Sequence, residues 1–157
     1  MNREELIQYL QDKFQDKIEL LDTGKVEPMF LIKSRENLVS FCRAIVDDPQ
    51  LSMDFLCNLA GIDTGEHFEV VYNVASIRNK TRFDFKVVMD YDGAWVESIK
   101  EIWPAANWYE REVWELFGID VKNHGNLKRF LLPDDWDQGH PMRKNWDAPD
   151  FKRMPEF

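Results

Sequence analysis

The sequence predicts an α+β fold in which helices pack on a mixed β-sheet and an extended C-terminal arm follows. The chain has 157 residues, of which 44% are hydrophobic and 13% aromatic, enough for the core of one compact domain. Apolar residues recur at helical spacing in some segments and alternate in others. After Gly118, prolines and glycines interrupt any long regular element. We therefore expect a globular domain over 1–120 and an extended arm over 121–157.

Apolar spacing predicts the elements of the first two thirds of the chain. The expected helices cover 3–14, 34–47 and 52–61, and the expected strands cover 17–21, 26–33, 67–77 and 82–89. The expected helix caps are Asn2 with Glu5, Ser34 and Ser52. Gly61 is expected to end the third helix, and Pro28 indicates that the second strand lies at a sheet edge. This pattern suits a sheet with helices against one face.

A further helix is expected over 108–117, after a short helical turn around 95–102. Asn107 and Glu110 form a capping-box pattern at its start, and Gly118 suits a left-handed cap at its end. The stripe expected to pack on the sheet consists of Tyr109, Val113, Leu116 and Phe117. The opposite side carries Trp108, Glu110, Arg111, Glu112, Trp114 and Glu115. Tryptophans among charges require a cover, either the chain's own arm or a partner protein, unless they are isolated exposed aromatics.

The composition argues against several function classes. The formal net charge is −9 at pH 7 without a basic block, which argues against nucleic acid and anionic lipid as partners. The first ten residues resemble neither a signal nor a transit peptide, and no apolar run approaches the roughly 20 residues that span a bilayer. We therefore expect a cytoplasmic-type compartment. Cys42 and Cys57 are expected to be reduced core residues that hold no iron–sulfur cluster.

A catalytic role for the carboxylates of the charged helix is an alternative interpretation. Paired carboxylates act as general acid and base when burial separates their pKa values. Spacing spreads Glu110, Glu112 and Glu115 around the helix, and Arg111 is placed to pair with Glu115 one turn later. A free-standing enzyme that uses these three carboxylates stays open as the competing class of function.

The two histidines of this region suggest a metal site only weakly. His124 and His140 lie near Asp134 and Asp135, but their spacing matches no His-x-x-x-His or Cys/His pattern. The sequence also contains no glycine-rich phosphate loop and no nucleophile elbow. We expect no metal and no cofactor in this chain.

Several motifs in this region resemble those of a known family. The run over 110–119, EREVWELFGI, resembles the E-R-E-x-x-D-[LM]-[FL]-G-I signature of the C-type subunit of the NADH-quinone oxidoreductases, the family of respiratory complex I. Downstream runs resemble its N-H-P-x-L-x-R-I-L-x-P-x-D-W and P-L-R-K-D segments in the same order. The strong match covers 103–151. Gly125 stands where the family usually has Pro, Asn145 where it usually has Asp, and Glu115 where Asp is common.

The resemblance implies a non-catalytic docking subunit of a peripheral arm, needed for assembly of an electron-transfer, ion-pumping complex. It implies contacts with two neighbours, the hydrogenase-large-subunit-like D-type subunit and the iron–sulfur B-type subunit. It also implies indirect contact with the membrane arm and a place at the cytoplasmic face of the membrane. The cofactors are then iron–sulfur clusters, and nickel–iron in the hydrogenases, all held by partner subunits. The alternative is the equivalent subunit of a membrane-bound energy-converting nickel–iron hydrogenase or of a ferredoxin- or F420-dependent relative.

The residues expected to make the interface or to anchor the arm lie within the motif region. They are Trp108, Glu110, Arg111, Glu112, Trp114, His124, Arg129, Trp136, His140, Arg143, Lys144 and Trp146. The three arginines are expected to form ion pairs, because guanidinium binds carboxylate in a bidentate fork. The four tryptophans are expected to supply buried area.

Overall fold

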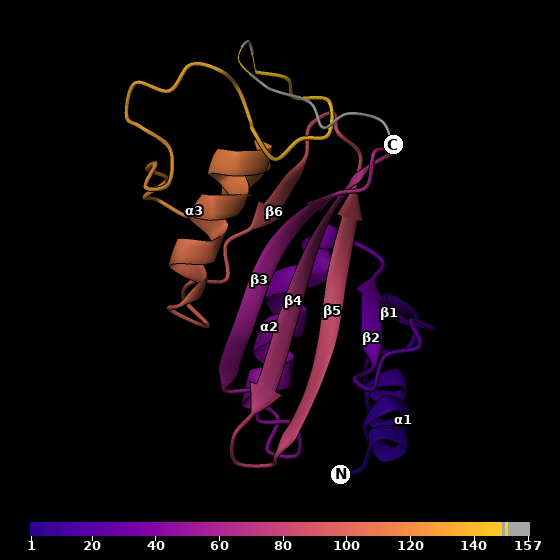
Figure 1. Ribbon diagram of the computed structural model, residues 1–157. Coiled ribbons are helices and arrows are strands. Elements are labelled where there is room, and N and C mark those ends of the chain that lie inside the picture. The colour runs from indigo at the N-terminus through magenta and orange to yellow at the C-terminus, as the bar shows by residue number, and fades with distance from the viewer. Residues whose placement is uncertain (149, 151–157) are drawn as a thin grey trace.

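The computed structural model describes residues 1–148 and 150, which form an α+β fold (Figure 1). Its helices are α1 (Arg3–Phe14), α2 (Leu38–Asp47) and α3 (Ala106–Phe117), with short 3₁₀ turns at Gln15–Lys17 and Arg35–Asn37. Its strands are β1 (Ile18–Leu21), β2 (Met29–Ile32), β3 (Phe55–Asp63), β4 (Phe68–Ser76), β5 (Thr81–Met89), β6 (Trp95–Glu97) and β7 (Asp120–Lys122). Strands β1-β2-β5-β4-β3 form one sheet and β6-β7 a second. The β2–β5 pair is parallel and its neighbours are antiparallel, so the predicted mixed sheet is confirmed.

One face of the five-stranded sheet is buried beneath the helices. In Figure 1, α2 lies behind the long strands, α1 lies beside β1 and β2, and α3 lies at the other side, next to β3. Strict alternation in β4 and β5 points every second side chain into the core. Tyr72 and Phe85, which are partners in the β4–β5 register, stack with ring centroids 4.8 Å apart. Each such buried aromatic contributes about 1.5–3 kcal/mol of hydrophobic stabilisation.

The first helix and the hairpin agree with the sequence, except for the position of the hairpin in the sheet. Asn2 and Glu5 form the expected capping box, and β1 pairs with β2 in antiparallel register. The edge position predicted from Pro28 is wrong, because β2 lies between β1 and β5. Pro28 is tolerated because it precedes the first residue of the strand, and its carbonyl accepts a hydrogen bond from the Asp84 amide at 2.9 Å.

The helix predicted over 52–61 is wrong, since this segment forms β3. A register irregularity between Leu56 and Asn58 inserts an extra residue at Cys57. Leu56 and Leu59 both face the core as a result, and their spacing of three imitates a helix. Cys57 is exposed on the bulge, so its assignment to the core is also wrong, whereas Cys42 is buried as expected.

Close packing, and not a helix end, explains Gly61. A Cβ at this position would lie 2.8 Å from the Phe117 ring. Glycine therefore lets α3 approach β3, and Tyr109 of the same helix donates a hydrogen bond to the Cys57 carbonyl at 3.4 Å.

The region before α3 also differs from its prediction. The helical turn expected around 95–102 begins as strand β6, which pairs in parallel with β7. Asn107 is not the cap of α3, because the helix starts at Ala106 and Ala105 occupies the cap position without a side-chain hydrogen bond. Gly118 does end the helix in the left-handed conformation, with φ of 72°.

Candidate docking surface

Three of the four charged residues of α3 are buried. The exposed fractions of Glu110, Arg111 and Glu115 are 1%, 8% and 3%. The Arg111–Glu115 ion pair expected from spacing is wrong, because both side chains bind main-chain groups of the arm, which is one of the two covers expected for this side of the helix. Each charge instead binds a different segment of the chain, and buried charges require such partners.

Glu110 holds the segment that precedes α3. Its carboxylate accepts hydrogen bonds from the Ser98 hydroxyl at 2.6 Å and the Ile99 amide at 2.7 Å, and His124 Nε2 lies 3.7 Å away. Burial raises the pKa of Glu110 from 4.5 to about 7, against the lowering effect of these two hydrogen bonds. Burial also lowers the pKa of His124, whose ring lies between the Asn107 carbonyl and the Asn126 amide.

Arg111 and Glu115 hold the arm through its main chain. Arg111 Nε donates to the Lys128 carbonyl at 2.8 Å, and its Nη2 donates to the Arg129 carbonyl at 3.4 Å. The Glu115 carboxylate accepts from three successive amides over 130–132, the shortest at 2.7 Å from Leu132. Charge-assisted hydrogen bonds of this kind contribute about 1.5–3 kcal/mol each. The arm therefore lies across α3 in a defined path.

The arm returns to the C-terminal end of α3. His140 Nδ1 lies 3.0 Å from the Glu115 carbonyl, and Arg143 Nε donates to the Phe117 carbonyl at 2.6 Å. The Met142 amide donates to the Leu116 carbonyl at 3.1 Å. These contacts satisfy carbonyls that a helix end leaves without partners inside the helix.

Gly118 makes this return possible. A Cβ on Gly118 would lie 2.7 Å from Arg143 Nη2 and closer still to the His140 ring. The residue therefore meets two demands at once, a positive φ and a close approach by the arm.

An apolar patch with a central cation stays exposed where α3 meets the arm. We call the surface formed by Trp108, Arg111, Phe130 and Leu131 the Trp108 patch. The Trp108 and Phe130 rings contact each other edge to face with centroids 5.3 Å apart, and the Arg111 guanidinium lies beside both, at 4.7 and 4.8 Å from their centroids. The three apolar side chains are nevertheless 55%, 39% and 51% exposed. Exposed aromatics around an arginine are typical of protein interfaces.

The other predicted interface residues lie elsewhere. Trp114 is half-buried against the core, and Glu112 is half-buried on α3. Arg129 is exposed and donates to the Asp134 carbonyl at 3.2 Å. The Trp136 and Trp146 rings lie together with centroids 6.2 Å apart.

Lys144 ties the arm to the end of β3. Its amide donates to Asp63 Oδ2 at 2.9 Å, and its amine donates to the Thr64 carbonyl at 3.1 Å. Sequence reasoning missed Asp63, as well as Phe130 and Leu131 of the Trp108 patch. Two adjacent apolar residues in a segment without regular structure were the available signal for the patch.

Residues 1–148 and 150 contain neither a metal-ion site nor a membrane-spanning helix. No group of three or more His, Cys, Asp or Glu side chains in this part of the chain is arranged to hold a metal ion. No helix formed by these residues is long and apolar enough to cross a membrane.

A sequence model of one protein family, described as respiratory-chain NADH dehydrogenase, 30 kDa subunit, matches residues 31–152. The chain belongs to this family. One relative within the NADH dehydrogenase 30 kDa family is the C-type subunit of the NADH-quinone oxidoreductase of Roseiflexus sp. (strain RS-1), which is 42% identical over 113 residues. That alignment covers 70% of this chain but 64% of the relative, so the chain spans less than two thirds of the relative's length.

Two solved structures share the fold of this chain. One is a chain of the membrane-bound sulfane sulfur reductase, described as an archaeal respiratory membrane complex, with a TM-score of 0.75 and 23% identity. That match covers 93% of this chain and 86% of the other. The second is a trypsin-resistant fragment of Nqo5, with a TM-score of 0.64 and 25% identity over 78% of this chain and 98% of the fragment.

Proposed function

We propose that this chain is a docking subunit in the peripheral arm of a complex I-like membrane-bound oxidoreductase, at the cytoplasmic face of the membrane. Its partners are the hydrogenase-large-subunit-like D-type subunit and the iron–sulfur B-type subunit, which hold the redox cofactors. Through them it contacts the membrane arm indirectly. Its role is assembly, and electron transfer takes place in the partners. Membership of the 30 kDa family supports the type of complex.

The Trp108 patch is the observation that carries the docking role. Its aromatic side chains are more than one third exposed although they pack around a buried arginine. Covering them with a partner would remove their apolar area from water, at about 25 cal/mol per Å². Arg111 already uses Nε and Nη2 to hold arm carbonyls, so the patch is rigid before a partner arrives.

The burial of the motif charges weighs against the alternative of a free-standing enzyme. Glu110 and Glu115 bind separate segments, residues 98–99 and 130–132, so they do not converge as an acid and base pair. Replacing Glu112 by Gln together with His140 by Ala separates the two views. A free-standing enzyme would lose turnover while its assemblies persist, whereas a docking subunit would lose its complex first.

Copurification tests the docking role. The affinity-tagged chain is expressed in its source organism, and detergent-solubilised membranes are analysed for the proteins that accompany it. The double variant Trp108→Ser, Leu131→Ser should fold normally by circular dichroism and lose the large D-type partner and the iron–sulfur partner. The matched control is Val26→Ser, Ile77→Ser, whose apolar side chains are 80% and 69% exposed outside the patch, and it should keep both partners. Equal recovery of both partners with the two double variants would refute the proposal.

A hydrogenase-type or ferredoxin-dependent complex is the second candidate. The same fold occurs in a chain of the membrane-bound sulfane sulfur reductase, so the fold alone does not assign the complex to the quinone reductases. The copurified large D-type partner decides between the branches. Nickel-binding cysteines in that partner would assign the complex to the hydrogenases, and their absence would favour the quinone reductases.

A further inference from the structure

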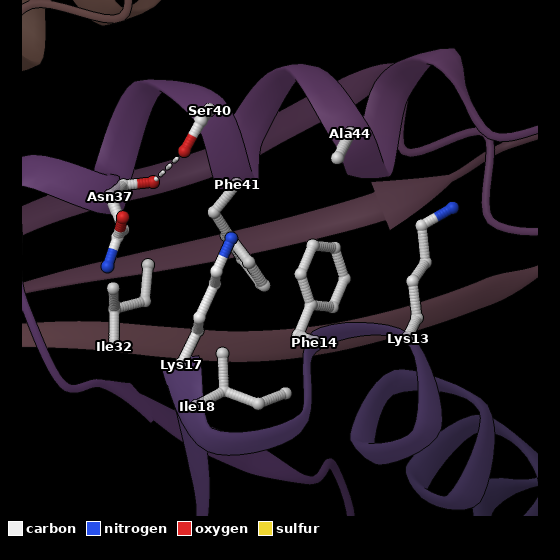
Figure 2. Close-up of a pocket in the computed structure, with 9 residues that line it drawn as sticks. All are labelled: Lys13, Phe14, Lys17, Ile18, Ile32, Asn37, Ser40, Phe41 and Ala44. Atoms are coloured by element: carbon white, nitrogen blue, oxygen red, sulfur yellow. Dashed lines mark hydrogen bonds between the residues drawn. The ribbon is translucent and has the colours of Figure 1, made fainter.

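A pocket on the side of the molecule away from α3 has no part in the proposed docking by the Trp108 patch. It lies between the end of α1, the start of β1 and one face of α2 (Figure 2). Its volume is about 260 Å³. The lining residues are Lys13, Phe14, Lys17, Ile18, Ile32, Asn37, Ser40, Phe41 and Ala44.

The floor of the pocket is apolar and aromatic. Phe14 and Phe41 meet there with ring centroids 4.6 Å apart at an interplanar angle of 53°, and Ile18 and Ile32 complete the surface. All four are buried core residues that also line the pocket. A third ring seated on this floor would extend the aromatic cluster at the spacing that tilted rings prefer.

The rim of the pocket is cationic in an acidic chain. The chain carries a net charge of −9, yet the described residues that line this pocket include two lysines and no carboxylate. The Lys13 amine is paired with Asp48 and points away from the pocket in Figure 2. The Lys17 amine lies over the pocket in that view. Within the part of the chain that the structure describes, the Lys17 amine and the Asn37 side-chain amide have no hydrogen-bond or ion-pair partner.

We infer that this pocket receives one aromatic side chain of a partner protein in the complex, inserted next to a carboxylate that binds Lys17 and Asn37. The volume is below the 300–1,000 Å³ that is usual for pockets that hold drug-sized molecules, which favours a single side chain as the occupant. The positive rim selects an acidic neighbour for that side chain. This inference rests on the proposed function, because it requires that the chain is a subunit of a complex with neighbouring proteins.

The test titrates the full chain with N-acetyl-aspartyl-phenylalaninamide, followed by amide chemical shifts in NMR. We expect saturable shifts around Lys17, Asn37 and Phe41. The same peptide with Lys in place of Asp, or with Ala in place of Phe, should bind about tenfold more weakly or not at all, because each lacks one of the two matched groups.

Two variants with matched controls locate the site. Ser40→Trp fills the mouth of the pocket and should abolish the shifts, whereas Arg43→Trp places the same side chain on an exposed position of α2 outside the lining and should keep them. Lys17→Glu should weaken binding about threefold to tenfold, and Lys25→Glu, in an exposed loop, should leave it unchanged.

The possible outcomes separate this inference from the proposed function. Absence of shifts, or shifts that persist in Ser40→Trp, would overturn the inference, even if the Trp108 variants lose both docking partners. A free aryl carboxylate, 3-phenylpropionate, that binds about tenfold tighter than the peptide would overturn it in favour of a small-molecule site. Peptide binding as expected, with copurification unaffected by the Trp108 variants, would support the pocket and refute the proposed docking surface.

Discussion

Replacing Gly118 by Ala should release the arm from α3, and its cost follows from two separate terms. The left-handed backbone of this residue, with φ of 72°, costs an L-residue about 1–2 kcal/mol. The new Cβ would also displace Arg143 and His140, whose hydrogen bonds to the Phe117 and Glu115 carbonyls contribute about 2–4 kcal/mol together. The expected loss in the free energy of unfolding is therefore about 3–6 kcal/mol.

Gly125→Ala is the matched control for the backbone term. Gly125 has φ of 74° and nothing within 4 Å of its added Cβ, so only about 1–2 kcal/mol should be lost. Urea unfolding followed by tryptophan fluorescence and circular dichroism measures both variants. Equal destabilisation of the two, within about 0.5 kcal/mol, would show that the contacts of His140 and Arg143 at Gly118 do not hold the arm.

Three further predictions concern single buried or exposed groups. Because the pKa of Glu110 is raised from 4.5 to about 7, its contribution to stability is present below about pH 4.5 and lost as the pH rises through about 7, by about 3 kcal/mol. Glu110→Gln imitates the protonated acid, so thermal unfolding should show a flatter pH profile and higher stability than the wild type at about pH 8; an unchanged profile would contradict the burial argument. Glu115→Gln removes one acceptor oxygen and the negative charge, so amides 130–132 should exchange hydrogen at least about tenfold faster, while those of β4 serve as the internal reference. Cys57 should react with a thiol reagent in the folded protein, slowly at neutral pH because burial raises its pKa, and Cys42 only after unfolding; two equally reactive thiols would be inconsistent with the fold.

The spacing of apolar residues predicted an element correctly where nothing interrupted its regular burial pattern. Strands β4 and β5 followed from alternation because one face of each is buried along its whole length. The same rule failed for β3, since the bulge at Cys57 changed the spacing of Leu56 and Leu59 from two to three. A single inserted residue therefore converts a strand pattern into a helical one.

The charges of α3 show why the candidate surface could be predicted only in part. The helical projection indicated that this side of α3 needs a cover, but spacing within the helix predicted an ion pair between Arg111 and Glu115. The partners of Arg111 and Glu115 are main-chain groups 15–18 residues further along the chain, which no helical projection contains. A segment that forms no regular structure still has amides and carbonyls that need partners. This need for partners could have indicated from the sequence that Arg111 and Glu115 bind the main chain of the arm.

The hydrogen bonds from α3 to the arm are made with main-chain atoms of the arm. The path of the arm therefore depends little on which side chains the arm carries. Arg111 and Glu115 bind carbonyls and amides over 128–132, and these groups are the same whatever residues the arm carries. An exposed side chain such as Leu131 can therefore change without loosening these main-chain bonds, whereas the Phe130 ring also packs on Trp108 and Arg111. If the proposed docking role holds, replacing a few exposed arm side chains would change the contact surface while α3 keeps the arm in place.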